Sequence, residues 1–301
     1  MQAFTDLAFA TLRLTTPIIL AALAGLLSQQ VGLINIALEG MMLAAAFAAV
    51  LGAFYAQHAL VGVVAAVVTG MLVALVFAVF VLRFRANLIV AGLAANILAL
   101  GGTGYLLQVL YQTRGAFAPP GLRGLGTVHI PGLSQIPILG PILDGHSPLV
   151  YVTWVLVILT SIFLNRTVTG LRVRAVGEQA EAATTVGIPA RRLQYGMLLA
   201  AGGLCGLAGA QMSLGNLQLF VYNMTNGRGF MALAAVFFGQ AQPWATTLGS
   251  VVFGFFDALQ IRLQTTVGVP PQITQILPFL SIVVVLTWVS WRRYRARPVA
   301  A

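Results

Sequence analysis

Residues 40–82 read GMMLAAAFAAVLGAFYAQHALVGVVAAVVTGMLVALVFAVFVL, a run that contains no Asp, Glu, Lys or Arg. A transmembrane helix needs about 20 consecutive apolar residues, so this run is long enough for two crossings. The chain must fold back between them, and the polar pair Gln57-His58 marks the place. The stretch therefore predicts two antiparallel membrane-spanning helices joined by a tight turn.

The rest of the chain has the same apolar character. Hydrophobic residues make up 59% of the sequence and charged residues 7%, against roughly 45–50% and 25% in soluble proteins. We expect one all-α membrane domain, a polytopic helical bundle of about eight to ten spans. The expected spans are residues 14–28, 36–56, 60–82, 87–111, 147–165, 194–214, 227–240, 244–261 and 274–291.

The basic residues predict orientation. All 16 are arginines, and the net charge of +10 could suit nucleic acid, but most lie at the ends of the predicted spans. Placing the C-terminal tail in the cytoplasm puts the majority on that side, as the positive-inside rule requires, and it puts the N-terminus outside. The arginines predicted inside are Arg83, Arg85, Arg166, Arg172, Arg174, Arg191, Arg192, Arg292, Arg293, Arg295 and Arg297, and those predicted outside are Arg13, Arg114, Arg123, Arg228 and Arg262.

A weak repeat divides the domain into two halves. GMMLAAAF at residues 40–47 is similar to GFMALAAV at residues 229–236, and the predicted spans run in opposite directions. Inverted repeats of this kind are common in transporters. The expected parts are a first half (14–165), a cytoplasmic coupling segment (166–193), a second half (194–291) and a cytoplasmic tail (292–301). The Gly- and Pro-rich outer loop 112–146 is either a solvated cover or a docking surface for an external protein.

Polar residues interrupt the apolar spans at a few places. Asn35 and Glu39 lie in the run QQVGLINIALEG at residues 29–40, and Asn96 lies in the middle of a span. Asn216 and Gln218 form a similar break in the second half. Such groups must face the protein interior or a water-filled cavity. They either line a translocation path or form a hydrogen-bond network that fixes the breaks.

Three further features have simpler interpretations. Asp257 lies five residues before Arg262, which predicts a loose ion pair. Gly202, Gly203, Gly206 and Gly209 predict close packing of their helix against a neighbour. The three histidines, His58, His129 and His146, have no ligand spacing and are expected at the surface, so no metal site is predicted. The sequence contains no lysine, so it cannot contain the phosphate-binding loop of an ATPase.

The main polar segment, RVRAVGEQAEAATTVGI at residues 172–188, is too charged for lipid. Glu178 and Glu181 are predicted in the first turn of a short helix, where carboxylates suit the positive end of the helix dipole. Ala182 and Ala183 give it a small surface for close docking, and Gly187 ends it.

This segment resembles the cytoplasmic coupling segment of ATP-binding cassette importer permeases. Glu181-Ala182-Ala183 followed by Gly187 fits their E-A-A-x-x-x-G pattern, and the run RAVGE at 174–178 resembles the form found in the permease family for branched-chain amino acids, simple sugars and nucleosides. Residues 31–43, VGLINIALEGMML, look like the N-terminal signature of its nucleoside and simple-sugar branch. Two departures are Gln29-Gln30, where a Glu-Arg pair is usual, and Gln179-Ala180, where Asn-Pro is common.

The resemblance implies a permease subunit in a prokaryotic cell membrane, in contact with membrane lipid and without an ATPase site of its own. Its expected partners are two cassette ATPases that bind ATP and Mg, a second and paralogous permease, and an external substrate-binding protein or lipoprotein. Nucleosides are the preferred substrates. Simple sugars such as ribose, or branched-chain amino acids, are the alternatives, and an ion-coupled secondary transporter is the alternative from another class. The residues expected to contact the ATPase are Arg174, Gly177, Glu178, Glu181, Ala182, Ala183 and Gly187, and those expected along the path are Asn35, Glu39, Asn96, Asn216 and Gln218.

Overall fold

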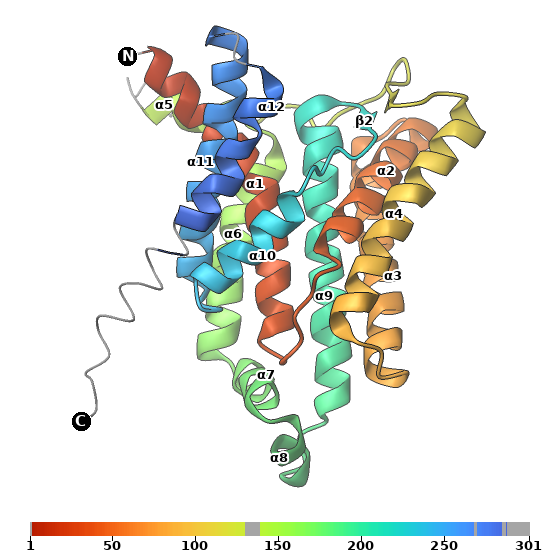
Figure 1. Ribbon diagram of the computed structural model, residues 1–301, viewed down its shortest axis with the longest axis vertical. Coiled ribbons are helices and arrows are strands. Elements are labelled where there is room, and N and C mark those ends of the chain that lie inside the picture. Colours follow the sequence, from red (N-terminus) through yellow and green to blue (C-terminus); the bar gives the residue numbers. More distant parts are fainter. Residues whose placement is uncertain (1, 130–138, 268–269, 285–286, 288–301) are drawn as a thin grey trace.

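The computed structural model describes residues 2–129, 139–267, 270–284 and 287, which form an elongated bundle of helices (Figure 1). The strands in this described part are two short ones, β1 (Ala116–Phe117) and β2 (Phe220–Val221), which pair antiparallel. The prediction of an all-α polytopic membrane bundle is confirmed.

Long helices form the body of the bundle and short ones lie at its ends. In chain order the elements are α1 (Gln2–Gln29), α2 (Leu38–Ala56), α3 (Ala59–Ala78) with its π-helical continuation η1 (Val79–Arg83), α4 (Leu88–Tyr111), α5 (Leu139–Leu143), α6 (Pro148–Arg166), α7 (Val168–Glu178), α8 (Ala180–Thr185), α9 (Ala190–Ala210) with its π-helical continuation η3 (Gln211–Leu217), α10 (Arg228–Phe238), α11 (Pro243–Val267) and α12 (Pro271–Thr274). A further helical stretch covers residues 276–284. We call the end that carries α7 and α8 the α7–α8 end, and the end near the chain's N-terminus the opposite end (Figure 1).

Seven helices in the described part are long and apolar enough to cross a membrane: α1, α2, α3 with η1, α4, α6, α9 with η3, and α11. They match every predicted span except 227–240 and 274–291, although α1 begins well before the predicted residue 14. The predicted fold-back is also present. α2 ends at Ala56, Gln57 has a left-handed backbone with φ 52°, and the His58 ring accepts a hydrogen bond from the Leu60 N–H at the start of α3.

The predicted helical crossing at 227–240 is wrong. α10 has 11 residues, which at 1.5 Å per residue gives about 16 Å, roughly half of the 30 Å hydrocarbon core. The chain reaches α10 through β2 and a series of turns in which Asn223, Asn226 and Gly227 have positive φ. The predicted span 274–291 is helical over 276–284, and its C-terminal part falls largely outside the described residues.

Three of the four glycines named from the sequence, Gly202, Gly206 and Gly209, allow α9 to pack tightly as predicted, whereas a Cβ atom at Gly203 would make only ordinary contacts. A Cβ atom at Gly202 or Gly206 would collide with the α3 backbone around Gly70 and Ala66, and one at Gly209 would collide with α2 at Met42. Small residues at such contacts let helix backbones approach closely. This close packing matters in a membrane because the hydrophobic effect does not drive helices together there. α9 therefore joins α2 and α3 at the centre of the bundle.

The two copies of the repeat meet inside the bundle. α2 runs from the middle of the molecule towards the opposite end, and α10 runs from the middle towards the α7–α8 end (Figure 1). A Cβ atom at Gly229 would overlap the backbone of Glu39, so the two helix starts are in direct contact. Residues 35–40 and 227–229 form this meeting point, which we call the central junction.

Candidate functional site

Glu39 joins the two helix starts at the central junction. Its Oε1 accepts a hydrogen bond from the Gly227 N–H at 2.8 Å, and its Oε2 accepts one from the Gly229 N–H at 2.6 Å. The residue is 9% exposed. The first N–H groups of a helix lack partners within the helix and carry partial positive charge, which favours a carboxylate at this position. Glu39 therefore belongs to the first turn of α2 and also caps α10.

An ion pair holds α10 from its other side. The Arg228 guanidinium donates to Asp257 Oδ2 through Nε at 3.0 Å and Nη2 at 2.8 Å, and its Nη1 donates to the Met224 carbonyl at 3.1 Å. The two charged side chains are only 16% and 6% exposed. The sequence placed Arg228 on the outer side and predicted Arg262 as the partner of Asp257, but the structure places Arg228 within the bundle as the partner of Asp257 on α11.

Asn35 shapes the break before α2. It is fully buried, its Oδ1 accepts from the Ala37 N–H at 3.1 Å, and its Nδ2 approaches Ser28 Oγ at 3.4 Å. A side-chain oxygen that binds the backbone N–H two residues later stabilises a turn in place of a continued helix. Asn35 thus stabilises the turn through which the non-helical segment after α1 leads into α2.

Asn96 connects α4 to the same break. Its Oδ1 accepts from the Gly40 N–H at 2.8 Å, and its Nδ2 donates to the Ile36 carbonyl at 2.9 Å. A Cβ atom at Gly40 would collide with the backbone of Ala95 and Asn96, so α2 and α4 touch here. The structure therefore brings together Asn35, Glu39 and Asn96, and each of the three side chains binds backbone at the junction.

Asn216 and Gln218 lie elsewhere, beyond the far end of α9. Gln211, which is fully buried, donates from Nε2 to Asn216 Oδ1 at 3.1 Å and accepts from Ser147 Oγ at 2.6 Å. Gln218 is exposed, with φ 54°. Gln211 and Ser147 were not predicted, although a Gln in the uncharged run 193–227 is a signal that could have indicated Gln211.

The polar segment 172–188 forms two helices in place of one. Glu178 is the last residue of α7, so its predicted place in a first turn is wrong, whereas Glu181 does lie in the first turn of α8. Gln179, in extended conformation, separates the two helices. Gly187 has φ +84° directly after α8, a conformation that favours glycine and confirms its predicted role as a helix stop.

Most of the predicted coupling residues of this segment face outward. Ala183 is buried and Gly177 is partly buried, and the other five are exposed: Arg174, Glu178, Glu181, Ala182 and Gly187. The segment lies at the extremity of the bundle (Figure 1). It therefore presents a continuous accessible surface with both signs of charge.

Gly177 connects this segment to the break between α1 and α2. A Cβ atom at Gly177 would collide with the Gln30 carbonyl, and the Gly32 backbone, with φ +77°, lies against Gly177. The Gln30 side chain in turn donates from Nε2 to the Ala241 carbonyl at 2.7 Å, in the loop between α10 and α11. A pocket of about 640 Å³ opens among these three segments, lined by Gln29, Gln30, Leu164, Asn165, Arg174, Gly177, Glu178, Gln240, Ala241, Gln242, Pro243 and Trp244.

His146 departs from the prediction of surface histidines, because it is 2% exposed. Its ring stacks on Phe9 with centroids 4.0 Å apart, and its Nε2 lies 2.9 Å from the Ile142 carbonyl. Burial lowers the pKa of His146 below its ordinary value, and its Nε2 is the donor because a carbonyl oxygen only accepts. Its role is to pack α1 against the start of α6.

Comparison with known proteins agrees with this architecture. The family model described as "Branched-chain amino acid transport system / permease component" matches residues 7–286. The guanosine ABC transporter permease protein NupQ of Bacillus subtilis is 33% identical over 95% of this chain and 92% of its own length. The nucleoside ABC transporter permease protein NupC of Lactococcus lactis is 31% identical over 90% and 88%. The putative glucose ABC transporter permease protein TsgC13 of Haloferax volcanii is 29% identical over 96% and 92%.

These matches extend across all the candidate spans, the central junction and the α7–α8 segment. They confirm the resemblance suggested by residues 31–43 and 174–187. With seven apolar helices of spanning length among its described residues, the protein is a multi-pass protein of the prokaryotic cell membrane. The chain therefore belongs to the family of permease components of the branched-chain amino acid transport system, within the ABC transporters.

Proposed function

We propose that this permease forms the translocation path of an ATP-driven importer of nucleosides, which works by alternating access. The names of two relatives, NupQ and NupC, support nucleosides as the substrate class. ATP and Mg are bound and hydrolysed by two partner cassette ATPases. A second, paralogous permease completes the path, and an external binding protein delivers the substrate.

The observation that carries this proposal is the central junction. Two helices of opposite direction, α2 and the short α10, begin at the same point inside the membrane domain, and each is preceded by non-helical backbone. Non-helical backbone at membrane depth persists only where protein buries it or where it lines a cavity. Transporters built from inverted repeats place their path next to such interrupted helices. Asn35, Glu39 and Asn96 hold this junction in place beside the path, and Asn216 and Gln218 lie towards its outer entrance.

The α7–α8 segment is the proposed contact with the ATPase. It combines exposed charge, the small exposed side chain of Ala182 and the glycine stop at Gly187, and it reaches the first break of the bundle through Gly177. A short rigid helix transmits a partner's movement as a rigid-body displacement. This contact assigns the segment to the cytoplasmic side.

Sugar transport is the second candidate, because TsgC13 is a putative glucose permease and aligns over nearly the whole chain. Nucleosides contain a ribose ring, so hydroxyl recognition alone does not separate the two classes. The substrate class is therefore best tested by uptake.

Uptake of labelled guanosine, ribose, glucose and leucine should be measured in cells from which this chain has been deleted and to which it has been restored. We expect guanosine uptake to fall at least about tenfold on deletion and to return on restoration. Loss of ribose or glucose uptake with unchanged guanosine uptake would assign the permease to sugars. Loss of leucine uptake alone would assign it to amino acids.

The coupling assignment needs separate variants in the restored strain. Glu181→Arg and Gly187→Leu should reduce uptake per assembled permease about tenfold or more, because the first reverses a charge on the exposed α8 surface and the second strains its end. Val186→Leu, at an exposed neighbour with ordinary backbone, should leave uptake unchanged. Normal uptake by well-expressed Glu181→Arg and Gly187→Leu permeases would remove α8 from the coupling surface.

A further inference from the structure

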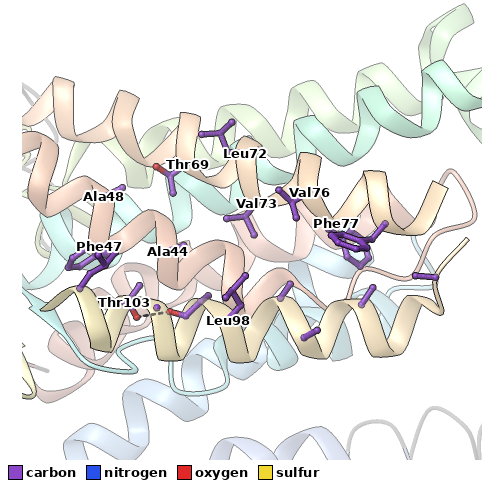
Figure 2. A pocket seen from close by; sticks show the side chains of 18 of the residues that line it. Ala44, Phe47, Ala48, Thr69, Leu72, Val73, Val76, Phe77, Leu98 and Thr103 are labelled. Atoms are coloured by element: carbon purple, nitrogen blue, oxygen red, sulfur yellow. Dashed lines mark hydrogen bonds between the residues drawn. The ribbon is translucent and has the colours of Figure 1, made fainter. Parts of the chain in front are cut away.

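An apolar groove of about 820 Å³ runs along the side of the bundle between α3 and α4, with α2 as its floor (Figure 2). Aliphatic and aromatic side chains, alanines and one glycine line it, together with Thr69 and Thr103. The Thr103 hydroxyl already donates to the Ala99 carbonyl at 2.7 Å within its own helix. The groove therefore offers almost no hydrogen bonds and suits an apolar occupant.

The groove exists because α4 packs on α2 and has little contact with α3. Asn96 and Gly92 hold α4 against the start of α2, and a Cβ atom at Gly92 would collide with Ile36. On α4 itself, Ile97, which does not line the groove, is 70% exposed, and the lining residue Leu98 is 71% exposed. In the membrane the space between α3 and α4 must be filled, since a void would forfeit the contacts of the groove's apolar walls.

The groove follows nearly the whole length of α4. Its lining extends from Ala86 to Leu106, which at 1.5 Å per residue is about 30 Å, the thickness of the hydrocarbon core. Acyl chains fit such a narrow channel along the membrane normal.

Two arginines lie at the α7–α8 end of the groove. Arg83 ends η1, three residues after the lining residue Phe80, and Arg85 directly precedes the lining residue Ala86. Both side chains are exposed, and neither guanidinium has a hydrogen-bond or ion-pair partner within the described part of the chain. Arg85 also has a positive φ of 55°, because the chain turns sharply here from η1 into α4.

We infer that this groove binds an anionic phospholipid of the leaflet on the α7–α8 side. Its acyl chains occupy the half of the groove next to Arg83 and Arg85, since one leaflet contributes about 15 Å of the hydrocarbon core, and its phosphate group pairs with these two arginines. Guanidinium groups form strong charge-assisted hydrogen bonds with phosphate oxygens, and basic sites next to transmembrane helices recognise anionic head groups. The lipid packs against the side of α4 that faces α3, where the two helices have little contact with each other. α4 in turn carries Asn96, which binds the central junction.

Native mass spectrometry of the full-length permease can test this inference with two probes that share palmitoyl and oleoyl chains, phosphatidylglycerol and phosphatidylcholine. We expect the wild-type permease to bind one phosphatidylglycerol more tightly than phosphatidylcholine. Each arginine near a membrane surface contributes about fivefold, so Arg83→Gln/Arg85→Gln should weaken phosphatidylglycerol binding about thirtyfold. The matched pair Arg191→Gln/Arg192→Gln, exposed at the start of α9, should have little effect.

A second pair of variants tests the groove itself. Val76→Trp places a bulky side chain into the groove from an exposed position, and it should weaken the binding of both lipids about tenfold or more. Val64→Trp, on an exposed part of α3 outside the groove, should leave binding unchanged.

Three results would overturn the inference. The first is equal affinity of the wild-type permease for the two lipids. The second is an equal loss of phosphatidylglycerol binding in the Arg83→Gln/Arg85→Gln and Arg191→Gln/Arg192→Gln permeases, which would indicate a nonspecific charge effect. The third is cross-linking of a Val76→Cys permease, in a Cys205→Ser background, to a sister permease, with unchanged lipid binding by Val76→Trp. That result would make the groove a subunit interface. None of these outcomes depends on which substrate the importer carries.

Discussion

Glu39 and Asp257 show how this protein stabilises carboxylates within an apolar bundle in two different ways. Glu39 binds backbone N–H groups at a helix start, and Asp257 binds the Arg228 guanidinium. Charged groups at the centre of a membrane helix cost about 2.5–3.5 kcal/mol on insertion scales. The start of α10 compensates both carboxylates. Its backbone N–H groups place partial positive charge against Glu39, and its Arg228 places a full positive charge against Asp257.

The Arg228–Asp257 pair should be strongly coupled. Asp257→Asn leaves the guanidinium without its counter-charge in a largely buried place, and breaking a buried pair in this way costs about 3–5 kcal/mol. The loss of unfolding free energy is measured by titrating the purified permease in detergent with a denaturing surfactant and monitoring its unfolding. Arg228→Gln/Asp257→Asn should recover part of it, because both charges are then gone.

Arg192→Gln, an exposed change at the start of α9, is the control and should alter stability by less than about 0.5 kcal/mol. Additive losses in the double variant would contradict the coupling.

At the scale of elements, the notable connection is between α7 and the break that follows α1. Gly177 touches the Gln30 carbonyl without an intervening side chain, and the Gln30 amide reaches the loop after α10. One helix at the α7–α8 end is thus linked to the segments that adjoin both α2 and α10.

Gly177→Val should disturb this link selectively. The added side chain has no room beside Gln30, so α7 must shift away from residues 30–32. We expect uptake per assembled permease to fall at least about tenfold while ATP hydrolysis by the assembled transporter continues. Leu171→Val, an exposed change on the same helix, should leave both measurements unchanged. A simultaneous loss of assembly, uptake and hydrolysis would show that Gly177 has only a structural role.

At the scale of the whole molecule, both ends of the bundle should be distinguishable by chemical labelling. In a Cys205→Ser background, cysteines at the exposed positions Arg85 and Arg174 should react with a membrane-impermeant maleimide only from the cytoplasmic side. A cysteine at Thr127, exposed at the opposite end, should react only from outside. Labelling of positions 127 and 174 from the same side would contradict the orientation.

Apolar runs and arginine positions predicted the long helices well, because membrane depth imposes a simple requirement of length and composition. They failed at α10, because an apolar sequence does not reveal that its helix starts halfway through the membrane. They also placed Arg228 outside, since its partner Asp257 lies 29 residues away. Glu39 was recognised as unusual, but its binding groups, the N–H groups of Gly227 and Gly229, are about 190 residues away. No local pattern indicates such a contact.

The double attachment of α10 limits how this molecule can move. Glu39 fastens its start to α2, Asp257 fastens the next residue to α11, and Asn96 fastens α2 to α4. These helices are therefore held together at the central junction. A rearrangement that opens one end of the bundle would tilt them about this point. We expect bending to fall in the non-helical stretches that adjoin these helices, residues 30–37, 218–227 and 239–242, none of which contains a charged residue.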